Sequence, residues 1–206
     1  MNFLGHFYTS ADDPAVMAGS FLGDFLKGSV EDHPPELSRG LRLHRAVDAI
    51  GDRLQGFRDT CRLLRPSCDR YARVVADIVG DHLLASSWRK FATISLAQFT
   101  VACHGVLEEW AGSFGPVPRS VATRLMRERW LESYASLEGL EESLRRFQRR
   151  IRTPLAITEV IDTVAENRET LVPGYRSFIS ELEANPRIIS LRPPRPGWVI
   201  LSRHGA

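Results

Sequence analysis

The chain has 206 residues, a length typical of one compact domain. Hydrophobic residues make up 43% of it, which excludes a wholly disordered protein, and 27 basic against 25 acidic residues leave a net charge of only +2. We therefore expect neither nucleic acid nor a membrane as partner. The three cysteines form no Cys-x-x-Cys pair, and no signal peptide or membrane span is evident, so we predict a cytoplasmic protein.

Helical periodicity dominates the chain. Apolar residues recur three and four apart while alternating strand patterns are absent, so the predicted fold class is all-α, a compact bundle of about seven helices. The predicted helices lie near residues 13–28, 37–50, 71–84, 95–111, 118–137, 138–151 and 155–184. Repeated prolines then predict an irregular tail, which divides the chain into a helical domain at 1–185 and a Pro/Arg-rich tail at 186–206.

The first predicted helix begins where Asp13 can cap it and Pro14 can occupy its first turn. Its later part carries Asp24 beside Phe25 and Leu26. Burying an unpaired carboxylate among such neighbours is costly, so Asp24 is a candidate functional residue. The alternative is a capping or turn aspartate.

Two further helices carry acidic and histidine side chains at helical spacing. His44 and Asp48 are four residues apart and so share a face of one helix. Asp77 and Asp81 lie one turn apart on another helix, followed directly by His82. Two carboxylates on one face repel each other unless a positive charge lies between them. Imidazole and carboxylate groups converging from different helices suit a catalytic divalent ion.

Structural alternatives remain for each of these residues. Asp77 and Asp81 are also compatible with a solvated helix face, and His44 with a buried, hydrogen-bonded histidine. His6 lies between apolar neighbours, where packing is a more frequent role than chemistry. The chain contains no Gly-x-Ser-x-Gly, P-loop or Gly-x-Gly-x-x-Gly motif, which argues against serine hydrolases and against nucleotide-loop and dinucleotide-binding folds.

A dense group of arginines follows on a later helix. It consists of Arg145, Arg146, Arg149, Arg150 and Arg152. Such a group is either a solvated face neutralised by the glutamates upstream or a docking surface for an acidic partner or a phosphate.

Motifs in the first 90 residues or so resemble those of the acyl carrier protein phosphodiesterase family, in the family's order. They are Met1-Asn2-Phe3-Leu4 followed by His6, Gly23-Asp24-Phe25 with Lys27-Gly28, Gly40 followed by Leu43-His44-Arg45 and Asp48, and Asp77 with Asp81-His82 and Trp88. The resemblance implies a divergent member of the all-helical HD phosphohydrolases, with the adjacent Asp81-His82 pair in reversed order.

The resemblance also implies an activity and a partner. The expected enzyme is a phosphodiester hydrolase that removes 4′-phosphopantetheine from the serine of holo acyl carrier protein and so yields the apo protein. The expected cofactor is manganese, or another divalent metal such as magnesium. Acyl carrier proteins are acidic, which gives the arginine group an expected partner.

Site roles follow from the same resemblance. Expected metal ligands are Asp24, His44, Asp77 and His82; expected catalytic residues are Asp81, His6 and Asp48; and expected phosphate-binding residues are Arg45 and Lys27. Asp81 and Asp48 are alternative ligands or orienting groups. Two other functions stay open: an HD-type hydrolase of a nucleotide such as a guanosine polyphosphate, and a non-enzymatic helical binding module.

Overall fold

The structure is a computed structural model that describes residues 1–11 and 13–194. Every regular element in this part of the chain is a helix, which confirms the all-α prediction. The α-helices are α1 (Phe3–Ser10), α2 (Pro14–Leu22), α3 (Pro35–Gly51), α4 (Gln55–Cys68), α5 (Ala72–Ser86), α6 (Leu96–Glu109), α7 (Pro116–Arg127), α8 (Trp130–Ser133), α9 (Leu137–Gln148), α10 (Ile157–Glu166), α11 (Arg168–Ala184) and α12 (Pro186–Leu191). The 3-10 helices are η1 (Val30–Asp32), η2 (Asp69–Tyr71), η3 (Trp88–Lys90) and η4 (Ala111–Ser113).

The helices are shorter and more numerous than the seven or so predicted. No helix was predicted at α1 or α4. The helix predicted over 118–137 is divided because Arg129 adopts left-handed backbone angles, φ 50° and ψ 47°, which interrupt a right-handed helix. The one predicted over 155–184 is divided at Asn167 (φ −101°, ψ 13°). The first predicted helix starts at Pro14 with the Asp13 cap in place, but it ends at Leu22 and not near Gly28.

The first part of the predicted tail is helical and packs on the body of the protein. The Asn185 side chain caps α12 by accepting a hydrogen bond from the Arg187 amide. α12 packs against α3, where the Arg39 guanidinium donates to the carbonyl oxygens of Leu191 at 2.6 Å and Arg192 at 2.7 Å. The predicted irregular tail was therefore wrong for 186–191, and its residues 195–206 lie outside the described part.

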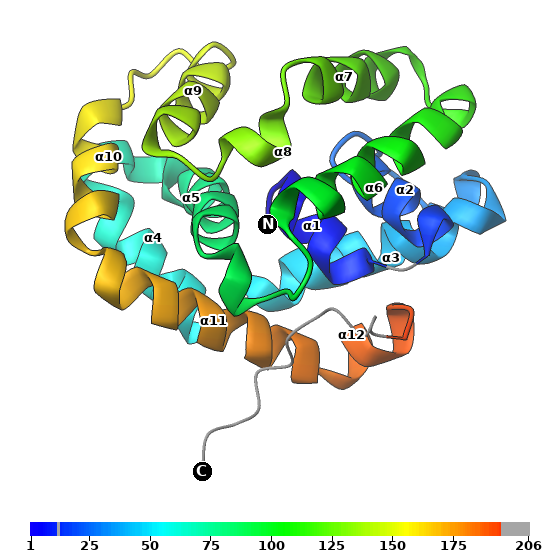
Figure 1. The fold of residues 1–206 in the computed structure, drawn as a ribbon, viewed down its shortest axis with the longest axis horizontal. Helices are drawn as coiled ribbons and strands as arrows, with labels where there is room; N and C mark the ends of the chain where they lie inside the picture. The colour runs from blue at the N-terminus through cyan, green and yellow to red at the C-terminus, as the bar shows by residue number, and fades with distance from the viewer. Residues whose placement is uncertain (12, 195–206) are drawn as a thin grey trace.

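The helices surround α1, which lies at the centre of the molecule (Figure 1). It packs against α2, α3 and α5, and its residues from Leu4 to Ser10 are all buried. α11 runs along one side of the bundle against α4 and α5 (Figure 1). No helix within the described ranges is long and apolar enough to cross a bilayer. The first helix of the chain is thus the central element against which α2, α3 and α5 pack.

Two glycines bring α2 and α3 into backbone contact. A Cβ atom added to Gly19 would lie 2.2 Å from the Leu37 carbonyl oxygen, and one added to Gly40 would lie 2.2 Å from the Val16 carbonyl oxygen. Any larger residue would force the two helices apart. This close crossing brings the end of α2, and Asp24 beyond it, next to the middle of α3.

Candidate active site

The carboxylate of Asp81 holds the N-terminal end of α1. The cap residue of α1, Asn2, makes no side-chain cap hydrogen bond, so the first amides of the helix need another acceptor. The Leu4 amide donates to Asp81 Oδ2 at 2.8 Å, and the Gly5 amide donates to Asp81 Oδ1 at 2.9 Å. Both oxygens of this buried side chain are therefore used in fixing α1 against α5.

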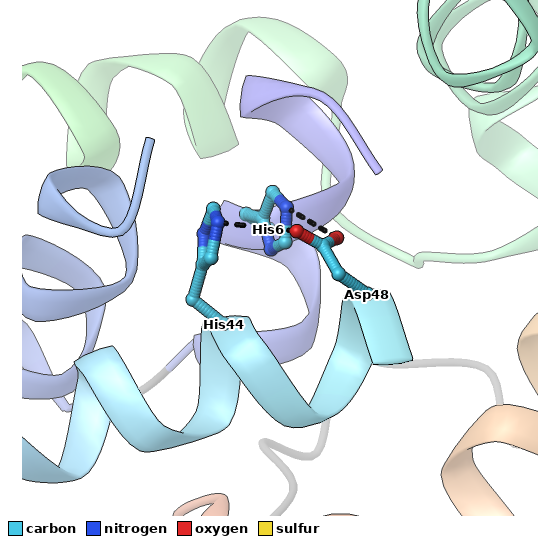
Figure 2. A group of neighbouring side chains, drawn as sticks. All are labelled: His6, His44 and Asp48. Atoms are coloured by element: carbon cyan, nitrogen blue, oxygen red, sulfur yellow. Dashed lines mark ion pairs between the residues drawn. The ribbon is translucent and has the colours of Figure 1, made fainter. Parts of the chain in front are cut away.

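α1 in turn places His6 beside His44 and Asp48 of α3 (Figure 2). His6 Nε2 lies 3.2 Å from Asp48 Oδ1, and His44 Nε2 lies 3.3 Å from Asp48 Oδ2. The two imidazole rings stack, with centroids 3.8 Å apart and planes 17° apart. Both histidines are buried, whereas the Asp48 side chain is 42% exposed, so the cluster opens to solvent at Asp48.

Gly23 sets the position of the His44 ring from the other side. A Cβ atom at Gly23 would lie 2.2 Å from His44 Cγ and 2.6 Å from His44 Nδ1. The backbone just after α2 therefore touches the imidazole, and no other residue type fits without moving it. The next residue is Asp24, so this contact also brings that carboxylate beside the cluster.

Two more carboxylates border the cluster. The Met1 ammonium pairs with Asp48 Oδ1 at 3.0 Å and with Asp77 Oδ1 at 2.8 Å, which joins α3 to α5. Burial raises the pKa of Asp77, and the positive charge of the Met1 ammonium opposes this. The Asp24 side chain is exposed at the surface. Desolvation by the surrounding protein nevertheless raises its pKa to about 6; the nearby His44 opposes this increase, and the negative charge of Asp48 adds to it.

The electrostatics of the cluster favour a neutral His6 beside an ionised Asp48. Burial and the neighbouring charge of His44 lower the pKa of His6 to about 3. Burial would raise the pKa of Asp48, but His6, His44 and the Met1 ammonium outweigh it and hold that pKa well below its ordinary value. A neutral imidazole and an ionised carboxylate are the forms that bind metal ions.

The donor set fits a divalent metal ion. Among the described residues, His6, His44 and Asp48 are the one group of three His, Cys, Asp or Glu residues whose ligand atoms all lie within 4.8 Å of one another. Two imidazole nitrogens and a carboxylate oxygen suit a first-row divalent ion with open positions for water and substrate. Asp77 and Asp24 border this group and would add oxygen ligands.

The four expected metal ligands are therefore not gathered as one set. His44 belongs to the cluster, and Asp77 and Asp24 border it, but His82 Nδ1 lies 2.8 Å from the Tyr134 carbonyl oxygen, on the side of α5 that faces α8. Successive helical residues point about 100° apart, so Asp81 shares a face with Asp77 whereas His82 does not. Of the expected catalytic residues, His6 and Asp48 lie in the cluster, and Asp81 binds the end of α1.

The expected phosphate-binding residues flank the cluster along the chain. Arg45 follows His44 and is half-buried, and its Nη2 donates to the Leu26 carbonyl oxygen at 3.4 Å. Lys27, three residues after Asp24, is exposed. Both side chains therefore start close to the cluster.

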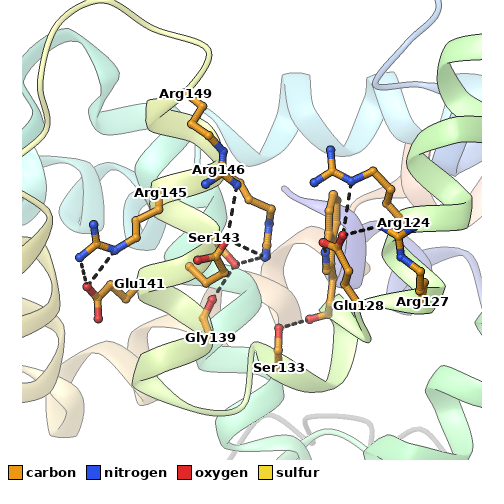
Figure 3. Close-up of polar contacts among 12 residues, drawn as sticks. Arg124, Arg127, Glu128, Ser133, Gly139, Glu141, Ser143, Arg145, Arg146 and Arg149 are labelled. Atoms are coloured by element: carbon orange, nitrogen blue, oxygen red, sulfur yellow. Dashed lines mark hydrogen bonds and ion pairs between the residues drawn. The ribbon is translucent and has the colours of Figure 1, made fainter.

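Three of the five arginines in the group that begins on α9 have partners within the protein (Figure 3). Arg145 pairs with Glu141, and Arg149 pairs with Glu142 at 3.4 Å. Arg146 is drawn inward, where its guanidinium lies 4.4 Å from the centroid of the Trp130 ring. Arg150 and Arg152 lie beyond the end of α9 and are exposed, as are Arg145 and Arg149.

Comparison with known proteins identifies the family. The family model described as acyl carrier protein phosphodiesterase matches residues 1–182. The chain belongs to the acyl carrier protein phosphodiesterase family. It is 27% identical over 146 residues to the acyl carrier protein phosphodiesterases of Salmonella paratyphi A and Salmonella newport and 26% identical to that of Enterobacter sp. strain 638, covering 70% of this chain and 76% of each relative.

This membership confirms the resemblance drawn from the sequence and the enzyme class, a phosphodiester hydrolase. No solved structure matches the chain, so the relation to HD phosphohydrolases stays a prediction. The match begins at residue 1 and includes His6, Gly23, Asp24, His44, Asp48 and Asp77. The cluster and the residues around it therefore lie within the part that defines the family.

The Gly23 contact generates a first prediction. We expect Gly23→Ala to lower turnover of a phosphodiester substrate roughly 10- to 100-fold, because the added methyl group displaces the His44 ring, and a displacement of about 1 Å is enough for such a loss. Steady-state kinetics measures the effect. Gly112→Ala is the matched control, since nothing lies within 4 Å of its added Cβ atom. Parental turnover in Gly23→Ala would contradict the proposed contact.

A second prediction concerns Asp81. Burial raises its pKa to about 7, against the favourable hydrogen bonds from Gly5 and Leu4. A carboxyl group whose pKa is higher in the folded than in the unfolded state favours folding when protonated, so this stabilisation is present below about pH 4 and is lost as the pH rises to about 7. The loss amounts to roughly 4 kcal/mol, at about 1.4 kcal/mol for each pH unit.

Asp81→Asn removes this titration and keeps one acceptor for α1. The free energy of unfolding of the parent, relative to that of the variant, should therefore be highest near pH 4 and should fall as the pH rises to 7. Urea unfolding followed by circular dichroism at several pH values measures it. A difference that does not vary with pH would show that Asp81 titrates as an ordinary exposed carboxylate.

Proposed function

We propose that this chain is a metal-dependent phosphodiesterase that releases 4′-phosphopantetheine from the serine of holo acyl carrier protein. The observation that carries the proposal is the meeting of His6, His44 and Asp48 in one cluster that is open at Asp48. The family of the chain supports the substrate, since its relatives bear the name acyl carrier protein phosphodiesterase. The absence of nucleotide-loop motifs favours this substrate over a guanosine polyphosphate.

In this proposal His6, His44 and Asp48 hold the metal, and Asp77 and Asp24 are the further carboxylates beside it. The mixed nitrogen and oxygen donor set favours manganese over magnesium, which prefers oxygen ligands alone. When bound, such an ion lowers the pKa of a water molecule and offsets negative charge on the phosphate. His82, turned toward Tyr134, has no ligand role in it.

The other residues orient the reaction. Lys27 and Arg45 supply positive charge where the phosphodiester enters, and Asp81 acts as a positioning residue that keeps α1 and His6 in place. In the hydrolysis, a water oxygen forms a bond to phosphorus while the bond from phosphorus to the serine oxygen breaks. The serine oxygen takes up a proton, and the prosthetic group leaves as a phosphate monoester. The attacking water supplies that proton, and Asp24, a carboxyl group at the border of the cluster with a pKa of about 6, is placed to carry it.

The proposal places the enzyme in the cytoplasm. Cys61, Cys68 and Cys103 are all buried free thiols, which suits a reducing compartment.

Incubation of the purified protein with holo acyl carrier protein and manganese tests the proposal. Mass spectrometry of the carrier should show loss of the prosthetic group, chelation of the metal should stop the reaction, and added manganese should restore it. A guanosine polyphosphate should stay intact under the same conditions. An unchanged carrier together with rapid hydrolysis of the nucleotide would replace this function by the alternative one.

Substitutions localise the activity. We expect His44→Ala and Asp48→Ala to lower kcat by about 100-fold or more with little change in helical content, because each removes a ligand and not core packing. His33→Ala, a histidine outside the cluster, is the control and should keep parental kcat. Parental turnover in both cluster variants would exclude the cluster as the active centre.

A further inference from the structure

A row of arginines on α4 faces a groove that the sequence patterns did not single out. Arg58, Arg62 and Arg65 follow each other at spacings of four and three residues, which places them on one face of the helix over a rise of about 10 Å. Together with Arg73 from α5 they line a groove of about 320 Å³. All four side chains are exposed, and the buried residues Phe57 and Cys61 also line the groove.

The charge of this row is only partly neutralised. Arg62 pairs with Asp59 and Arg73 with Asp52, but neither Arg58 nor Arg65 forms an ion pair with a described residue. α4 contains three arginines and one acidic residue, and the arginine group that begins on α9 contains five arginines beside the three glutamates of that helix. The two surfaces carry the same surplus of two positive charges, but the three α4 arginines line one groove, whereas Arg146 of α9 packs on the Trp130 ring.

The groove opens beside the catalytic cluster. Phe57 lines it and also lines a narrow crevice that reaches Met1 and Asp77. Arg73 precedes Asp77 by one turn of α5, and its guanidinium lies 6.0 Å from the centroid of the Phe57 ring. The positive charge of Arg73 also lowers the pKa of Asp77 against the effect of burial. A partner bound along α4 would thus lie on the Asp77 side of the cluster.

We infer that this groove is the docking surface for an acidic segment of the protein substrate, with Arg58, Arg62 and Arg65 pairing with carboxylates at helical spacing. This inference rests on the proposed function and names the surface that recognises its substrate. A single small anion is bound by positive groups that converge on one point. Here the arginines form a line about two helical turns long, which fits an elongated acidic segment. Charge complementarity of this kind chiefly raises the association rate and sets the orientation of the partner.

The test compares two variants that each lose three positive charges. One carries Arg58→Gln, Arg62→Gln and Arg65→Gln on α4, and the other carries Arg145→Gln, Arg149→Gln and Arg150→Gln at α9. Binding of purified holo acyl carrier protein is measured by titration calorimetry over a salt series, together with kcat/KM for its hydrolysis. Turnover of bis(4-nitrophenyl) phosphate and helical content by circular dichroism report on the site and the fold.

We expect the α4 variant to weaken carrier binding and to lower kcat/KM about tenfold at low salt, to show a flatter salt dependence, and to keep turnover of the small diester within about twofold. The α9 variant should weaken binding less. Equal binding by the α4 variant and the parent would overturn the inference, as would a larger loss in the α9 variant. An equal loss on the small diester would overturn it too, because the arginines would then act on the site itself.

Failure of the proposed function gives a different result. If the parent binds the carrier through α4 but does not release its prosthetic group, the docking surface stands and the proposed reaction fails. If the parent hydrolyses the carrier and the α4 variant does so equally well, the reaction stands and the docking surface fails. No detectable binding of the carrier by the parent at low salt would also overturn the docking surface.

Discussion

The carboxylate of Asp81 is the contact on which the site depends. α1 has eight residues, too few to be stable alone, and it lies at the centre of the bundle, where unpaired amides are costly. The Asp81 carboxylate accepts hydrogen bonds from the amides of Leu4 and Gly5 and so holds this helix against α5. His6 on this helix then contacts His44 and Asp48 of α3. A buried carboxyl group with a raised pKa is the energetic cost of this arrangement.

Close backbone approach completes the geometry. Gly19 and Gly40 let α2 cross α3 in contact, and Gly23 presses on the His44 ring at the end of α2. Gly19 and Gly40 allow the close crossing of α2 and α3, and this crossing determines where α2 ends. Gly23 follows that end and determines the position of the His44 ring. Asp24 reaches the border of the cluster as a result. The site is therefore a property of packing among the first three helices and α5, more than of any single motif.

The sequence predicted those features that depend on local spacing. The all-α class, the Asp13 cap and the shared face of His44 and Asp48 follow from periodicity and short-range chemistry, and each is present. Features that depend on contacts between helices were not accessible in this way. α1 was missed as a helix because its stability comes from Asp81, which is 76 residues away from Gly5 along the chain.

Two groups of side chains show the same limit. His82 was grouped with Asp81 because they are neighbours in sequence, although neighbours on a helix point in different directions. The arginines of α9 stood out by density, but density does not reveal that glutamates and Trp130 already engage them. The α4 arginines are fewer and were overlooked, yet they line a groove together with Arg73, which lies one turn before Asp77 on α5.

Anomalous scattering from a crystal grown with manganese tests the central claim most directly. The account predicts a manganese peak among His6, His44 and Asp48, with Asp77 or Asp24 as its nearest further carboxylate, and Asp81 still bound to the amides of α1. A peak that includes His82 in its coordination, or a cluster free of metal at saturating manganese, would contradict the account.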